Sequence, residues 1–259
     1  MPVVTRSVSA FYRRTVFAVA LAALALVAVA AFAQGARAAL FEWDGVAATG
    51  VNPGSIATDA AGRVYVPQRN GGSVLVLDNA RNGNRPLAAI GGGRLQDPSA
   101  VAVDNRSTIY VADAASDTIR TFGPVYSGAD YRGTAAGSGP ALGQIRGPFA
   151  LATDPEPRLY VAEQGNVRVQ AFDPARGGLG NLFAFGVADP MPYGPPAGLA
   201  IDPLNRFFVS SSAAGAGVRF FDPRGAILGT AVPAGTGAGQ VNGASGLDTD
   251  AAGRLLVAD

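Results

Sequence analysis

The sequence predicts an all-β protein, a β-propeller with four complete four-stranded blades and a fifth unit that is incomplete. Three observations lead to this prediction. One aspartate-containing segment recurs five times, the intervening residues form short apolar runs separated by turns, and no stretch after residue 40 keeps a helical period. Repeats of this length, each made of several short strands, are typical of propeller blades.

The repeat is clearest where the same six letters, TDAAGR, occur at residues 58–63 and 249–254. Aligned on the aspartate, its five copies are spaced by 45, 50, 48 and 48 residues. We place the repeat starts near residues 52, 97, 147, 195 and 243, within one domain of residues 39–259. The copies read GSIATDAAGRVYVPQ (54–68), SAVAVDNRSTIYVAD (99–113), FALATDPEPRLYVAE (149–163), AGLAIDPLNRFFVSS (197–211) and SGLDTDAAGRLLVAD (245–259).

Each copy contains two short runs rich in β-branched and aromatic residues on either side of a polar turn, as expected for two strands of a hairpin. Further runs follow before the next copy. The third-strand candidates are VLVLD (74–78), TIRTF (118–122), VRVQAF (167–172) and VRFFD (218–222). The fourth-strand candidates are PLAAIG (86–91), NLFAFG (181–186) and AILGTA (226–231).

The second repeat has no obvious fourth strand but carries a long insertion, GPVYSGADYRGTAAGSGPALGQIRG, at residues 123–147. Two interpretations remain open. The segment either contains the missing strand plus a spacer, or is a loop that presents Tyr126, Tyr131 and Arg132 as candidate binding residues, since tyrosine and arginine are frequent interface anchors.

The repeated aspartates are expected to cap turns rather than to take part in chemistry. In Asp59-Ala60-Ala61-Gly62, the aspartate stands first in a type I turn and the glycine can adopt a positive φ. Such a turn closes the hairpin between the first and second strands. The predicted structural caps are Asp59, Asp104, Asp154, Asp202 and Asp250.

The blade sequences resemble the NHL-repeat family of β-propellers. The most similar segments are DPSAVAVDNRSTIYVADAASDTIRTFG (97–123) and GPFALATDPEPRLYVAEQGNVRVQAFD (147–173). The family's arginine before the third strand is matched only by Arg168. The resemblance implies that an N-terminal strand, here Leu40–Trp43, joins the last blade, so a ring of five or six blades would not be closed within this chain.

The residues that end the second strands would lie around one ring of such a propeller. They are Gln68, Asp113, Glu163, Ser211 and Asp259. Three carboxylates, those of Asp113, Glu163 and Asp259, could hold a cation such as Ca²⁺, which prefers oxygen ligands. The alternative is that each serves its own blade, for instance by pairing Asp113 with Arg120 and Glu163 with Arg168.

Composition excludes several kinds of chemistry. The chain has no histidine and no cysteine, so histidine-dependent triads, thiolate zinc sites and disulfides are ruled out for these residues. Its basic residues are all arginines, and those of residues 39–259 are scattered singly, so we expect no nucleic-acid partner.

The first 38 residues predict a secretory signal peptide. Arg6, Arg13 and Arg14 precede an uncharged run, Thr15–Ala33, and small residues at cleavage-like spacing follow. We therefore expect an exported protein, periplasmic or extracellular, with no membrane contact beyond this segment. A signal anchor is the alternative, because the run is close to the length that spans a bilayer.

These observations favour an exported binding scaffold that offers its channel mouth and loops to a protein or glycan partner at the cell surface. The alternative is an enzyme, since some propellers that resemble this chain are lyases or lactonases. The lyases rely on histidine-bound metal, which this chain cannot supply. We assign no catalytic residue and expect no cofactor, apart from the candidate Ca²⁺ site.

Overall fold

The computed structural model describes residues 53–79, 85–174, 180–186, 194–213 and 215–259. The regular structure in these ranges is β-strand, apart from one short 3₁₀ turn, η3 (Val125–Ser127). Within the same ranges, no helix has the length and apolar character needed to cross a membrane. The predicted closing strand, Leu40–Trp43, lies outside the described residues.

The strands form four four-stranded sheets and one two-stranded sheet, numbered here as blades 1 to 5. Blade 1 contains β1 (Ala57–Thr58), β2 (Val64–Gln68), β3 (Ser73–Leu77) and β4 (Pro86–Ile90). Blade 2 contains β5 (Pro98–Val103), β6 (Ile109–Asp113), β7 (Thr118–Phe122) and β8 (Tyr131–Ala136). Blade 3 contains β9 (Pro148–Thr153), β10 (Leu159–Glu163), β11 (Arg168–Asp173) and β12 (Gly180–Phe185).

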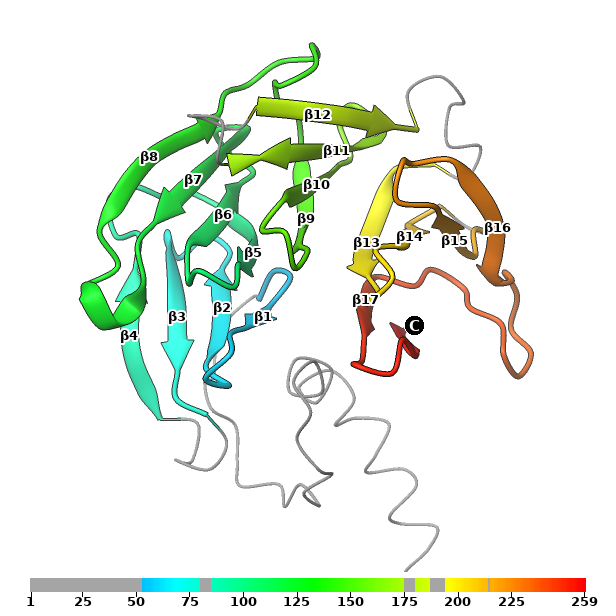
Figure 1. The fold of residues 1–259 in the computed structure, drawn as a ribbon, viewed down its shortest axis with the longest axis horizontal. Helices are drawn as coiled ribbons and strands as arrows, with labels where there is room; N and C mark the ends of the chain where they lie inside the picture. Colours follow the sequence, from blue (N-terminus) through cyan, green and yellow to red (C-terminus); the bar gives the residue numbers. More distant parts are fainter. Residues whose placement is uncertain (1–52, 80–84, 175–179, 187–193, 214) are drawn as a thin grey trace, which may run out of the picture.

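Blade 4 contains β13 (Pro196–Ile201), β14 (Phe207–Ser211), β15 (Val218–Phe221) and β16 (Ile227–Val232). The two-stranded blade 5 contains β17 (Gly246–Thr249) and β18 (Leu255–Ala258). Within every blade, consecutive strands pair antiparallel. The blades follow one another around a common centre, with the first strand of each innermost (Figure 1).

The hydrophobic core lies in layers between neighbouring blades. One cluster joins blades 1 and 2 through side chains such as Tyr65 and Ile109, and the next joins blades 2 and 3 through Tyr110 and Leu159. Similar layers follow between blades 3 and 4 and between blades 4 and 5. Because a middle blade is covered on both faces, every residue of β6 and of β10 is buried.

The all-β prediction and its four-stranded units are confirmed. In the second repeat, the fourth strand is β8. It lies inside the 123–147 insertion and pairs with β7, which comes just before the insertion. The interpretation of a hidden strand is therefore correct for residues 131–136. Residues Pro124–Gly128 form the turn around η3, and residues 137–147 lead into blade 3.

Side-chain hydroxyls also connect successive blades at the inner strands. Ser99 donates to the carbonyl of Pro148 at 2.7 Å, and Thr153 donates to the carbonyl of Val103 at 3.2 Å. Thr249 donates to the carbonyl of Ile201 at 2.7 Å. The innermost strands of neighbouring blades are thus joined by specific hydrogen bonds as well as by apolar packing.

Candidate functional site

The carboxylate of Asp113, at the end of β6, holds the segment that leads into its own blade. It is fully buried and accepts backbone N–H bonds from Gln96 and Asp97, at 3.2 and 2.9 Å. The guanidinium of Arg120 lies 3.6 Å away. These contacts occupy the carboxylate within blade 2.

Glu163, at the end of β10, is the centre of a denser buried network. It accepts a backbone N–H bond from Arg146 at 3.0 Å and a side-chain bond from Arg168 at 2.9 Å, and it also bonds Gln170. The same Arg168 donates to three carbonyls in the segment that precedes blade 3, those of Pro140, Ala141 and Gln144. This carboxylate and arginine together fasten that segment to the blade.

Asp259 repeats the arrangement in blade 5, where it accepts the backbone N–H of Asn242 at 2.7 Å. The three carboxylates proposed as a cation site therefore each bind the segment ahead of their own blade. Among the residues that the structure describes, no three acidic side chains come together in a way that could hold a metal ion.

The turn aspartates have the geometry of turn caps. The Oδ1 atom of Asp59 accepts the backbone N–H groups of Ala61 and Arg63, at 2.9 and 3.0 Å. Its Oδ2 atom accepts bonds from the Arg63 guanidinium at 2.6 Å and from the Tyr65 hydroxyl at 2.9 Å. The same pair of backbone bonds recurs at the other four positions, Asp104, Asp154, Asp202 and Asp250.

In four of the five turns, those of blades 1, 2, 4 and 5, the residue that ends the turn has a left-handed backbone. Gly62 and Gly253 have φ of +76°, while Ser107 and Asn205 occupy the same place with φ of +61° and +59°. Glycine and asparagine adopt this conformation readily, and serine does so less readily. The identical TDAAGR copies therefore use the residue best suited to the turn.

Blade 2 departs from this pattern at a single side chain. Four turn aspartates are paired with an arginine four residues later, as in the Asp154–Arg158 contact of 2.6 Å. In blade 2 that position is Thr108, which is too short to cover the carboxylate. The Oδ2 atom of Asp104 accepts a bond from the Tyr110 hydroxyl, at 3.2 Å, without an arginine partner among the described residues.

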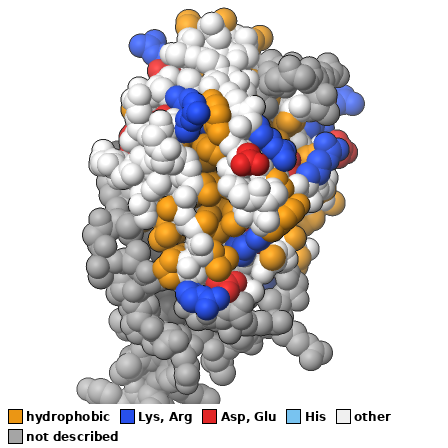
Figure 2. Space-filling view, turned by 90° about the vertical axis from the view of Figure 1, so that its left-hand side faces the viewer, with side chains coloured by type: hydrophobic (Ala, Val, Ile, Leu, Met, Phe, Trp, Pro, Cys, Tyr) orange, Lys and Arg blue, Asp and Glu red, His pale blue; other side chains and the backbone are white. Residues whose placement is uncertain are grey.

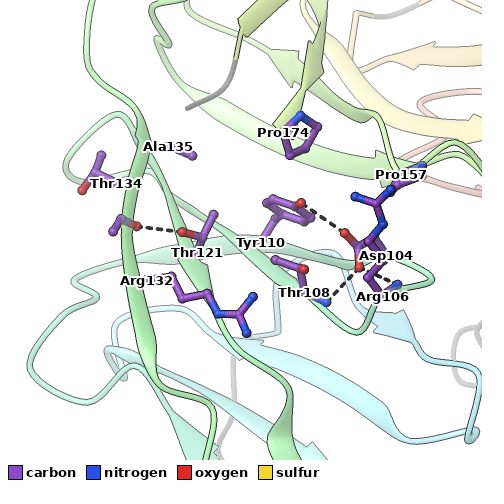
Figure 3. Close-up of a pocket in the computed structure, with 11 residues that line it drawn as sticks. Asp104, Arg106, Thr108, Tyr110, Thr121, Arg132, Thr134, Ala135, Pro157 and Pro174 are labelled. Atoms are coloured by element: carbon purple, nitrogen blue, oxygen red, sulfur yellow. Dashed lines mark hydrogen bonds between the residues drawn. The ribbon is translucent and has the colours of Figure 1, made fainter. Parts of the chain in front are cut away.

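A groove of about 430 Å³ lies at this point, between blades 2 and 3 (Figure 3). Arg132 reaches into it from β8, while Arg106 lies on the opposite side, on the β5–β6 turn, with Tyr110 between them. Hydroxyl groups and two prolines complete the lining. The lining residues are Asp104, Arg106, Thr108, Tyr110, Thr121, Arg132, Gly133, Thr134, Ala135, Pro157 and Pro174.

The groove combines fixed donors with exposed positive charge. Burial, together with the neighbouring Asp104 carboxylate, raises the pKa of Tyr110, so its hydroxyl stays protonated and donates. Arg106 and Arg132 are exposed, and neither guanidinium forms a hydrogen bond or an ion pair with another described residue. Their charge is therefore available to a ligand.

The structure separates the three candidate binding residues of the insertion. Arg132 lines the groove, whereas Tyr126 lies on η3 and is 73% exposed. The ring of Tyr131 packs on Phe122, with centroids 5.5 Å apart, and beneath the guanidinium of Arg94 at 4.9 Å. Tyr131 therefore belongs to the packing of blade 2.

Arg106, Thr108 and Thr134 line the groove but are not among the site residues predicted from the sequence. The sequence does contain a signal for Thr108, because the other four repeats have an arginine four residues after the turn aspartate and this repeat has a threonine. Arg106 and Thr134 gave no such signal. Their relation to Arg132 depends on how two separate segments meet in the fold.

Comparison with known proteins adds information on the fold. No family model matches the sequence, and no curated protein matches it. Many solved structures do match. Among them is a gluconolactonase from Xanthomonas campestris, 22% identical at a TM-score of 0.62, with 80% of this chain and 68% of that chain covered.

Two further matches are a chain of the nidogen/laminin complex and virginiamycin B lyase from Staphylococcus aureus. The first is 17% identical at a TM-score of 0.60, covering 81% of this chain and 72% of that one. The second is 10% identical at a TM-score of 0.56, covering 79% and 62%. The chain also spans 54% of the chain matched in hydrazine synthase from Kuenenia stuttgartiensis.

These likenesses show the fold, since every one of these identities is below 25%. Gluconolactonase and virginiamycin B lyase are β-propeller proteins, and the repeated four-stranded sheets of this chain follow the same plan. The prediction of a β-propeller is thereby confirmed. Fold alone does not determine activity, because propellers carry many unrelated functions.

Proposed function

We propose that this chain is an exported β-propeller of NHL type that acts as a binding scaffold, using its loops and grooves to hold a partner. The main support for this proposal comes from the contacts of the three carboxylates at the ends of the second strands. Asp113, Glu163 and Asp259 each accept a backbone N–H from the segment ahead of their own blade. Carboxylates that hold backbone segments in this way support a rigid binding scaffold rather than a catalytic centre.

The alternative is a propeller enzyme, because the similar structures include a gluconolactonase and a virginiamycin B lyase. An enzyme of this kind built on an oxygen-ligand metal site would need Glu163 to leave its buried network. That change would leave the guanidinium of Arg168, which is 3% exposed, without its carboxylate. An unpaired buried charge is strongly unfavourable, so the scaffold is the better-supported proposal.

The surface charge favours a protein or glycan partner over a nucleic acid. Figure 2 shows basic side chains in separate small groups over the visible described surface, several of them beside acidic side chains, and the arginines form no continuous stripe there. Nucleic-acid binding draws most of its affinity from clustered positive charge along a phosphate backbone. Residues 1–38, as a signal peptide, would deliver the domain to a compartment where surface glycans and proteins are the available partners.

The test uses the full gene product, purified from the exported fraction. It is titrated with Ca²⁺ in a calorimeter and assayed for lactone opening and streptogramin cleavage, and a glycan array screens it for binding. The proposal predicts a specific glycan or protein ligand, no stoichiometric Ca²⁺ uptake and no turnover. Tight Ca²⁺ uptake that is lost in Glu163→Gln, or turnover in either assay, would replace the scaffold with the enzyme.

A further inference from the structure

We propose that the groove between blades 2 and 3 binds a sugar acid, a small ligand with one carboxylate and several hydroxyl groups. The proposal rests on the proposed binding function and assigns it a site. Three features of the described residues support it: a missing arginine, a contrast with the same groove in blade 4, and a pair of unpaired guanidinium groups.

The first feature is the acceptor at the base of the groove. In blades 1, 3, 4 and 5, an arginine covers Oδ2 of the turn aspartate at 2.5–2.6 Å. Thr108 replaces that arginine in blade 2, and among the described residues the Oδ2 atom of Asp104 receives only the Tyr110 hydroxyl, at 3.2 Å. A carboxylate oxygen can accept more than one hydrogen bond, so this atom can still accept a ligand hydroxyl.

The second feature is the groove at the equivalent place between blades 4 and 5, which has a volume of about 330 Å³. Its lining includes Phe208, Phe220 and Leu255, and Arg206 folds across it with its guanidinium 5.9 Å from the centre of the Phe208 ring. Phe208 and Phe220 correspond to Tyr110 and Thr121 of blade 2 in strand register. One backbone framework therefore gives an apolar groove in blade 4 and a polar groove in blade 2.

The third feature is the positive charge at the rim. Arg106 and Arg132 approach the groove from two different elements, and their repeat equivalents in blade 4 are Leu204 and Leu228. Guanidinium groups bind carboxylates through paired, charge-assisted hydrogen bonds, and that geometry suits arginine better than lysine. Since neither guanidinium has an ion-pair partner among the described residues, a ligand carboxylate would supply one.

The size and lining of the groove fit this ligand class. A volume of about 430 Å³ lies within the roughly 300–1,000 Å³ typical of small-molecule sites. Thr108 and Thr121 bring hydroxyl groups to the walls, as Figure 3 shows, whereas the Thr134 hydroxyl points away from the groove and lies 3.0 Å from the Tyr131 hydroxyl. Polar walls of this kind match a ligand whose own surface is mostly hydroxyl.

The same chemistry is present in a free sugar acid and at the end of an acidic polysaccharide, so the experiment uses both. Galacturonate and a galacturonate trisaccharide are titrated into the full chain by calorimetry, with galactose as the neutral control and inorganic phosphate as the competing anion. We expect both galacturonate probes to bind, with the trisaccharide tighter if the polysaccharide end is the natural ligand. Galactose and phosphate should bind at least tenfold more weakly.

Three variants test the site. Thr108→Arg installs the arginine that four other turns already tolerate, so it should fold normally, fill the groove and abolish binding. Arg106→Leu and Arg132→Leu introduce the residues found at the equivalent positions of blade 4. Each should weaken the binding of galacturonate at least tenfold. Arg224→Leu changes an exposed arginine on the β15–β16 turn and is the matched control, expected to bind as the parent does.

The possible results distinguish the sugar-acid groove from the proposed scaffold function. Unchanged galacturonate affinity in a folded Thr108→Arg variant overturns the groove, even if the glycan array still reveals a ligand and the scaffold stands. Equal binding of galactose or phosphate overturns the sugar-acid assignment. Absence of binding by both galacturonate probes also overturns the sugar-acid assignment, whereas it leaves the scaffold proposal to the glycan array and to the Ca²⁺ and turnover measurements.

Discussion

Blades 2 and 4 share a backbone plan and differ in the groove that each forms with the next blade. Both have a buried turn aspartate bonded to two backbone N–H groups, and both pair the same strand positions. In blade 4 the aspartate is covered by Arg206, whereas in blade 2 it faces a polar groove beside Thr108. The repeat therefore fixes the turn and leaves the surface beside it free to vary.

The difference arises because the two bonds of Oδ1 are to backbone and do not depend on which side chains surround them. Any blade with the aspartate closes its hairpin. The Oδ2 atom instead depends on side chains at the fourth and sixth positions after the aspartate, which are Thr108 and Tyr110 in blade 2 but Arg206 and Phe208 in blade 4. A binding site can therefore arise in one blade without disturbing the fold.

We expect the largest effect when a turn aspartate with an arginine partner, Asp154, is replaced, compared with Asp104, which has none among the described residues. Asp154→Ala removes the acceptor of two backbone N–H groups, of Arg158 and of the buried Tyr160 hydroxyl. We expect it to lower the free energy of unfolding by about 3 kcal/mol, because buried donors lose their partner. Asp104→Ala should lower the free energy of unfolding by about 1 kcal/mol less, since no arginine loses its carboxylate partner there. Denaturant unfolding of both variants measures this gap, and equal losses would contradict the comparison.

The next prediction converts blade 4 towards blade 2. Arg206→Thr removes the partner of the buried Asp202 carboxylate, with which the guanidinium now makes a 2.6 Å contact. We expect a loss of about 1–2 kcal/mol, limited by the partial exposure of the arginine. Thermal unfolding checks the loss. The variant should not acquire galacturonate binding, because Phe208 and Phe220 keep the groove apolar; acquired binding would show that the arginine alone controls the site.

A smaller effect is expected at the tyrosine that blade 4 replaces with phenylalanine. Tyr110→Phe removes the hydroxyl bond to Asp104 and should cost about 1 kcal/mol. Tyr160→Phe removes the equivalent bond in blade 3, but Arg158 still covers Asp154 there, so the loss should be smaller. Urea midpoints of the two variants give the difference. A larger loss for Tyr160→Phe would mean that the arginine does not substitute for the hydroxyl.

The smallest prediction extends the comparison to blade 5. Asp248 stands where the other repeats have alanine, as at Ala102 and Ala200, and its burial raises the pKa of its carboxyl to about 6. The neighbouring Asp250 charge acts in the same direction, and the N–H of Thr249 opposes it. The shift means that the ionised group disfavours the folded state.

The sign of the pH dependence follows from that shift. A carboxyl whose pKa is higher in the folded than in the unfolded chain destabilises the fold above the folded value, and this penalty disappears below the unfolded value. Asp248→Ala should therefore stabilise the protein by about 1 kcal/mol at pH 7.5 and by much less at pH 4. Melting temperatures at the two pH values check it, and an equal gain at both would refute the titration of Asp248 as the cause.

Much of the fold could be predicted because its signals are local. Short apolar runs indicated β3, β4 and β12 to within a residue or two, and the aspartate turn with Gly62 indicated a hairpin from four consecutive letters. The pairs Asp113–Arg120 and Glu163–Arg168 are also close in sequence, so their contacts could be foreseen. The strand β8 was harder to recognise, because YRGTAA contains a glycine and two alanines in place of large apolar residues.

The candidate site could not be predicted in the same way. Arg106 and Arg132 are separated in the sequence by β6, β7 and η3, and Pro157 comes from the next blade. Their convergence depends on the angle between two sheets, which no local pattern encodes. The backbone partners of Asp113 were likewise invisible, since N–H groups such as those of Gln96 and Asp97 have no signature in the sequence.

The hydroxyl bonds between successive inner strands have a consequence for how the chain acquires its structure. Thr153 bonds Val103, and Thr249 bonds Ile201, so each bond joins a blade only to the one made just before it. Each of these bonds between described residues spans about one repeat, so a blade can condense on a neighbour that is already folded. Because each blade can form on a completed neighbour, assembly can begin at any blade and spread to the blades beside it.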